Sequence, residues 1–148
     1  MQLDPVIQQV ANPLQPHYER MNIPEDVTTL GSDELAELFT KLTGWADFFA
    51  SKLVEAQLDE RAKQLALDRF SSRLLLDRMG LATKADKVTH IKAEVSLDPR
   101  VVQLEDEVEV AYSYRKTYEM ILSNHERDLT LVSREITRRT SEGKRRDF

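Results

Sequence analysis

The histidines are the side chains of this sequence best suited to acid–base or metal chemistry, and they stand far apart at His17, His90 and His125. None of them has a second histidine, a cysteine or a carboxylate at a spacing that recurs in metal-binding motifs. The sequence contains no cysteine, which excludes thiolate metal sites, disulfides and cysteine nucleophiles. It also lacks a glycine-rich phosphate loop and a serine with a nearby histidine to activate it. We therefore expect no enzymatic activity, no cofactor and no metal site.

Basic residues form a clearer chemical pattern, and one stretch of them surrounds a phenylalanine. This stretch contains Arg61, Lys63, Arg69, Phe70, Arg73 and Arg78. Single-stranded nucleic acid needs cations to hold its phosphates and aromatic rings on which its bases stack. We therefore predict that this stretch binds single-stranded DNA. Asp68 and Asp77 lie in the same stretch, so a solvent-facing helix covered with salt bridges is the alternative.

The size and composition fit one ordinary domain, with 148 residues, of which 41% are hydrophobic and 32% are charged. No apolar run approaches the ~20 residues of a membrane-spanning helix, and the first residues do not resemble a signal peptide. We therefore expect an intracellular, cytoplasmic protein without membrane contact. The net charge of −5 hides an asymmetry, because residues 1–60 carry 3 basic and 11 acidic side chains whereas residues 127–148 carry 7 and 4. This polarity favours association between copies and leaves a basic face for a polyanion.

Prolines divide the sequence into an N-terminal arm and two segments that are free of this helix breaker. Four of the five prolines lie before residue 25, and the fifth is Pro99. Residues 1–31 are therefore expected to form an irregular or partly ordered arm. A long helix is predicted over 33–79, with Ser32 as its N-cap and Gly80 as the residue that ends it. Its apolar positions recur at spacings of three and four residues, at Leu35, Leu38, Leu42, Trp45 and Phe49.

The second long helix has a sharper start, because Asp98 is a strong N-cap and Pro99 suits the first helical position. From Val101 to Ile136 the sequence keeps the 3-4 spacing of a coiled coil, and the helix is expected to end near residue 140. The two helices are similar in length. An antiparallel hairpin is the economical way to pack them.

The connection over residues 81–97 is too long to be a bare loop in a compact domain. Val88, Ile91 and Val95 lie on one helical face, and Thr83 with Asp86 resembles a shortened capping box, so we expect a short helix here. The fold class is therefore expected to be all-α, with an antiparallel coiled-coil-like hairpin, a short connecting helix and the irregular arm. Residues 32–140 would form one helical, oligomerising domain and residues 141–148 a basic C-terminal tail.

Two helices with narrow apolar seams bury few side chains, so we expect the chain to form a homo-oligomer through its second helix. The predicted interface contains Val108, Arg115, Tyr118, Leu122, His125, Leu129, Val132 and Ile136. His125 is interpreted as a polar seam residue that fixes the register or the number of subunits, a role known for polar residues in coiled coils. Arg115 is interpreted in the same way, with an acidic residue across an interface as a further partner.

The order of these features resembles the UvsY-type recombination mediator proteins of tailed bacteriophages. The resemblance covers residues 40–136 and concerns a pattern of segments. These segments are Trp45-Ala46-Asp47-Phe48-Phe49, Leu67-Asp68-Arg69-Phe70-Ser71-Ser72-Arg73, Leu97-Asp98-Pro99-Arg100-Val101 and Ser133-Arg134.

The resemblance implies a ring-like homo-oligomer that takes part in DNA recombination, repair and replication. Such a protein binds single-stranded DNA, helps a RecA-like recombinase to displace the single-strand-binding protein, and hydrolyses nothing itself. It implies DNA contacts at Arg69, Phe70 and Arg73, with Arg61 and Lys63 nearby, and an oligomer interface on the second helix. The alternative from a different class is a coiled-coil assembly or scaffolding protein, such as a virion adaptor, that binds only other proteins.

Overall fold

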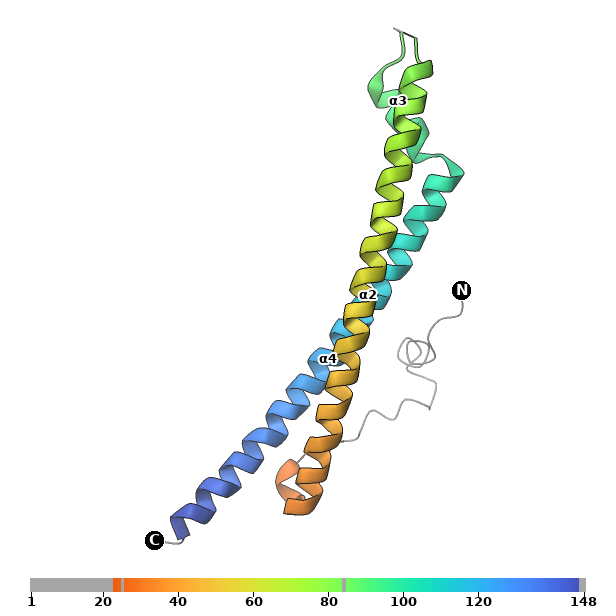
Figure 1. Ribbon diagram of the computed structural model, residues 1–148. Helices are drawn as coiled ribbons and strands as arrows, with labels where there is room; N and C mark the ends of the chain where they lie inside the picture. Colours follow the sequence, from red (N-terminus) through yellow and green to blue (C-terminus); the bar gives the residue numbers. More distant parts are fainter. Residues whose placement is uncertain (1–22, 25, 84, 147–148) are drawn as a thin grey trace. The chain divides into compact units, whose positions relative to one another are not determined.

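The computed structural model describes residues 23–24, 26–83 and 85–146, and these residues are helical apart from short connections (Figure 1). A 3₁₀ turn, η1 (Val27–Thr29), precedes the helices α2 (Ser32–Leu81), α3 (Val88–Ser96) and α4 (Pro99–Arg146). No strand occurs in the described ranges. The prediction of an all-α chain with two long helices and a short one between them is confirmed. Most of the predicted arm, residues 1–22, lies outside the described residues.

The chain divides into two compact units, and each long helix contributes a segment to both of them. Unit 1 contains the described residues up to Leu53 together with those from Thr117 onwards, and unit 2 is Val54–Lys116. Unit 1 therefore pairs the first part of α2 with the last part of α4. Unit 2 contains the rest of both helices and the whole of α3.

The core of unit 1 is formed where the beginning of α2 packs on the end of α4. Leu35, Leu42 and Val132 are almost fully buried there with Val27, and Leu129 and Ile136 pack against them. Further along α2, the Phe49 ring lies 6.3 Å from Tyr118 and 5.2 Å from His125, measured between ring centroids. Residues later in α2 thus meet residues earlier in α4, so the two segments run antiparallel within this unit.

The start of α2 lies one residue before the predicted position, because Gly31 and not Ser32 is the N-cap. The Gly31 carbonyl oxygen accepts the first helical hydrogen bond, from the Leu35 amide at 2.9 Å. The Gly31 amide donates to Glu34 Oε2 at 2.8 Å, which is the return half of a capping box. Glycine is an accepted N-cap residue, and Ser32 becomes the first helical residue. The end of α2 also differs, because the helix runs through Gly80 and no described glycine has a positive φ.

The connection to α4 contains the predicted short helix, but its N-terminus is built differently. Asp86 accepts bonds from the Thr83 amide at 2.8 Å and from the Thr83 hydroxyl at 3.1 Å, which closes a turn before the helix. The N-cap of α3 is Lys87, which makes no side-chain cap bond. Ile91 and Val95 are buried, whereas Val88, the third residue of the predicted face, is exposed.

The start of α4 confirms the predicted cap. Asp98 Oδ1 accepts a hydrogen bond from the Arg100 amide at 2.9 Å, and Pro99 is the first helical residue. The helix continues to Arg146, beyond the predicted end near residue 140. An i,i+4 bond of 2.7 Å from Arg138 to Glu142 supports this extension, so the segment expected as a tail is helical through residue 146.

The positions of the coiled-coil repeat in α4 form the side of the helix that is packed, since each of them is buried or half-buried within the chain. On α2 the repeat fails at Trp45, which is 42% exposed, while its neighbour Ala46 is buried. A straight helix turns by about 100° per residue, so a 3-4 pattern drifts around the axis and a neighbouring residue takes the inner position.

Over the part of the chain that is described, no helix has the length and apolar character needed to cross a membrane.

Candidate nucleic-acid interface

The predicted DNA-binding residues all lie on the part of α2 that belongs to unit 2, but their surroundings divide them into two groups. Arg61, Arg69 and Arg73 are exposed and form no ion pair with any residue that the structure describes. At about 100° and ~1.5 Å per residue, these three positions span roughly 120° of the helix surface and about 18 Å of its length. They therefore present three accessible guanidinium groups on one side of α2.

The other two cations of the stretch are neutralised by carboxylates. The Lys63 Nζ atom lies 3.0 Å from Asp59 Oδ2 on the preceding helical turn. Arg78 lies 3.5 Å from Glu94 and 3.8 Å from Asp98, and so ties the end of α2 to α3 and to the cap of α4. For Lys63 and Arg78 the structure therefore matches the alternative of a salt-bridged helix surface.

The aromatic residue of the stretch, Phe70, is half-buried. Only part of its ring is accessible for stacking on a base. Asp68 accepts a hydrogen bond of 2.9 Å from Gln64 one turn earlier, on the outer surface of the same helix. The structure thus brings together cations, a partly covered ring and a carboxylate along one helix.

The two polar residues of the α4 seam have their partners inside the chain. Arg115 Nε donates to Glu60 Oε2 and its Nη2 lies 3.5 Å from Glu60 Oε1, so a nearly bidentate ion pair links α4 to α2 within unit 2. His125 is buried in unit 1, with Nδ1 2.9 Å from the Ile121 carbonyl oxygen. Arg115 thus has an acidic partner within the chain, and the further partner expected for it across a subunit interface stays a prediction.

The predicted oligomer interface lies on the same buried side of α4. Tyr118, His125 and Val132 are buried, and the remaining members are half-buried, namely Val108, Arg115, Leu122, Leu129 and Ile136. Within each unit these side chains contribute to the packing of α4 on α2. Their role between subunits stays a prediction.

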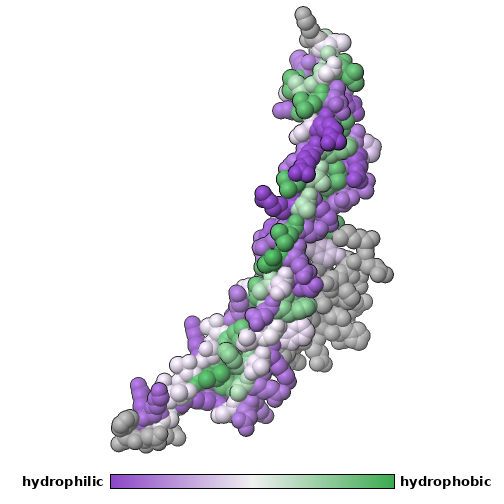
Figure 2. Space-filling model, in the orientation of Figure 1, coloured by the Kyte–Doolittle hydropathy of each residue, from purple (hydrophilic) through white to green (hydrophobic). Residues whose placement is uncertain are grey.

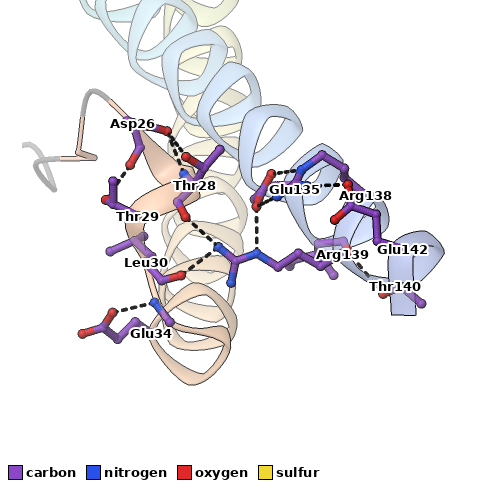
Figure 3. Close-up of polar contacts among 12 residues, drawn as sticks. Asp26, Thr28, Thr29, Leu30, Glu34, Glu135, Arg138, Arg139, Thr140 and Glu142 are labelled. Atoms are coloured by element: carbon purple, nitrogen blue, oxygen red, sulfur yellow. Dashed lines mark hydrogen bonds and ion pairs between the residues drawn. The ribbon is translucent and has the colours of Figure 1, made fainter. Parts of the chain in front are cut away.

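The C-terminal part of α4 uses its charges to hold the segment before α2, as Figure 3 shows. Glu135 is 6% exposed and accepts hydrogen bonds of 2.7–2.8 Å from Arg138 and Arg139. These bonds lower the pKa of Glu135 to about 2 and raise that of Arg138. Two of the C-terminal arginines are therefore engaged in structure, which leaves fewer positive charges on this end of the helix for a polyanion.

Sequence reasoning missed an exposed aromatic pair on α2 in unit 1. Trp45 and Phe48 are both about two-fifths exposed, and their rings meet edge to face at 5.8 Å. The Lys52 ammonium lies 5.8 Å from the centre of the Phe48 ring, a cation–π distance. The sequence signal was present, because Trp45, Phe48 and Lys52 follow one another at spacings of three and four residues.

The described residues contain no group of three or more histidine, aspartate or glutamate side chains that is able to hold a metal ion. His90 lies 3.3 Å from Glu94 on an exposed helix surface, and His17 is outside the described part.

Comparison with family models, with curated proteins and with solved structures finds no match for this chain. The function of the chain is therefore inferred from the chemistry of its surface.

Proposed function

We propose that this chain is a non-enzymatic protein that binds single-stranded DNA as a homo-oligomer and acts as a recombination mediator in the host-cell cytoplasm. In this role it helps a RecA-like recombinase to displace the single-strand-binding protein. One observation carries the proposal: Arg61, Arg69 and Arg73 are exposed on one side of α2 without a carboxylate partner among the described residues. Guanidinium groups in this state are available to phosphates, and several subunits that engage one strand multiply a weak single site.

The direct test is fluorescence anisotropy of a labelled oligo-dT titrated with the full chain at several salt concentrations. When the logarithm of the binding constant is plotted against the logarithm of the salt concentration, each phosphate contact with a single strand contributes about −0.7 to the slope. Three contacts in one subunit therefore give a slope of roughly −2. Weaker binding to a duplex of the same length is expected. Absence of binding at low salt would remove the DNA function.

A second function has an observation of its own. Among the described residues, sixteen large hydrophobic side chains are exposed, against fourteen hydrophobic residues in the buried core. Figure 2 shows hydrophobic residues between hydrophilic ones on the face that it presents. Exposed apolar side chains that adjoin one another, such as Trp45 and Phe48 with ring centroids 5.8 Å apart, mark contact with other proteins. An assembly or scaffolding protein is the function that this observation favours, and it predicts self-association without affinity for oligo-dT.

A further inference from the structure

In unit 2, α2 carries a second apolar stripe on the side that faces away from α4. We call Val54, Leu58, Arg61 and Leu65, which follow one another at spacings of four, three and four residues, the α2 outer stripe. Its aliphatic members are exposed by 54%, 64% and 41%. Leu58 lies two residues after the buried Ala56, a rotation of about 200°, so the stripe is nearly opposite the packed side of the helix. The chain's own α4 segment in unit 2 therefore cannot cover it.

A matching surface lies on α4 in the same unit. We call Val102, Glu105, Glu109 and Tyr112, at spacings of three, four and three residues, the α4 outer stripe. Val102 and Tyr112 are exposed by 41% and 39%. Glu105 and Glu109 are exposed, and neither has an ion-pair partner in the described part of the chain. This stripe thus has Val102 at one end and the Tyr112 ring at the other, with the Arg115 and Lys116 cations 5.1 Å and 5.9 Å from the ring centre, and two uncompensated carboxylates between them.

Charge and length decide which surface covers the α2 outer stripe. Two α2 outer stripes facing each other bring arginine close to arginine, and two α4 outer stripes bring glutamates together. An α2 stripe against an α4 stripe instead places Arg61 beside Glu105 and Glu109. At ~1.5 Å per residue the stripes are about 16 Å and about 15 Å long, so their apolar ends coincide. Nucleic acid is a poor occupant because the α2 outer stripe offers aliphatic side chains and no ring on which a base stacks.

We infer that a second copy of this chain covers the α2 outer stripe with its α4 outer stripe, so that Arg61 pairs with the glutamates of the neighbouring subunit. The pairing gives the oligomer of the proposed function an interface distinct from the buried α4 seam. It rests on the oligomeric part of that function. The interface withdraws Arg61 from DNA, so Arg69 and Arg73, which lie outside the stripe, remain as the phosphate contacts, and the salt slope expected for a subunit within the oligomer is about −1.4 rather than roughly −2.

The test is an exchange of charges, read as molar mass by light scattering after size-exclusion chromatography. The chain alone is expected to run as an oligomer with a mass above the 17.1 kDa of one subunit. Arg61→Glu places like charges together, and so does the double substitution Glu105→Arg with Glu109→Arg. Each is expected to reduce the mass to that of one subunit. The three substitutions together restore opposite charges and are expected to restore the oligomer.

Matched controls reverse exposed charges outside both stripes, at Arg127 and Glu126 on α4. Arg127→Glu and Glu126→Arg are expected to leave the mass unchanged, and circular dichroism checks that all variants stay helical. A monomeric parent protein, an unchanged mass in both reversed variants, or a combined variant that stays monomeric overturns the inference. Should one arm lose its helicity, Leu58→Asn with Leu65→Asn tests the same surface. Oligo-dT anisotropy is recorded separately, so that loss of DNA binding with an intact exchange pattern counts against the proposed function alone.

Discussion

Arg139 on α4 donates a hydrogen bond from Nη2 to the carbonyl oxygen of Leu30 at 2.7 Å, and so holds the segment that leads into α2. The same nitrogen lies 3.2 Å from the Thr28 carbonyl oxygen, while Nε donates to Glu135 at 2.7 Å. One side chain therefore satisfies two carbonyl groups of the η1 region, and a buried carboxylate fixes its direction. This contact joins the C-terminal part of α4 to the residues just before α2.

Replacement of Arg139 by alanine is expected to destabilise the protein. The Arg139→Ala variant loses the bonds to Leu30 and Thr28 and leaves Glu135 with fewer donors, so the free energy of unfolding should fall by about 1–3 kcal/mol. Urea unfolding followed by circular dichroism measures the change. The control is Arg145→Ala, an exposed position on the same helix, which should alter stability by less than ~0.5 kcal/mol. Equal losses in the two variants would contradict the role of Arg139.

Acid should weaken this same contact. The pKa of Glu135 is about 2 in the folded chain and 4.5 as an ordinary carboxyl, so the folded state favours the ionised form. Its contribution to stability is complete above pH 4.5 and is lost as the pH falls towards 2. Glu135→Gln is therefore expected to flatten the decline of the urea midpoint between these pH values. An unchanged decline in the variant would show that other carboxyls, such as Asp26 with its lowered pKa, control acid unfolding.

The sequence predicted those parts of the fold that depend on one strong local signal. Asp98 and Pro99 define the start of α4 because a side-chain acceptor and a missing amide both suit that point. The start of α2 was misplaced because Gly31 and Ser32 are both good caps, and the Glu34 side chain decides between them by reaching back. The inner position at Trp45 and Ala46 depends on how the helix drifts over its length, which spacing alone does not determine.

The residues of the candidate site could be listed from the sequence, but which of their charges are neutralised by carboxylates could not. The stretch from Arg61 to Arg78 was identifiable from composition, whereas the neutralisation of Arg78 needs Glu94 and Asp98, which approach only after the chain turns back. In the same way, the intramolecular partner of Arg115 is Glu60, 55 positions away. The coiled-coil spacing of α4 indicates a partner helix and does not tell whether that helix belongs to the same chain.

The seam of α4 is therefore expected to control folding, and Leu129 tests this. Leu129 is half-buried and packs against the unit 1 core formed by Leu35, Leu42 and Val132. Leu129→Ala should lower the free energy of unfolding by about 2 kcal/mol, at the lower end of the range for buried leucines. Leu131→Ala, two residues away and 45% exposed, is the control and should cost less than ~0.5 kcal/mol. Loss of oligomer mass with full stability in Leu129→Ala would assign this residue to a subunit interface instead.

The division of the basic residues into exposed and neutralised groups gives a sharp test of the DNA site. Arg69→Ala with Arg73→Ala removes two cations that have no carboxylate partner among the described residues, so binding to oligo-dT should weaken and its salt slope should decrease by about 1.4. Lys63→Ala with Arg78→Ala removes the same formal charge from ion-paired positions and should leave the slope nearly unchanged. Anisotropy titrations at several salt concentrations measure both slopes. Equal losses in the two double variants would indicate that total charge, and not the exposed side of α2, governs binding.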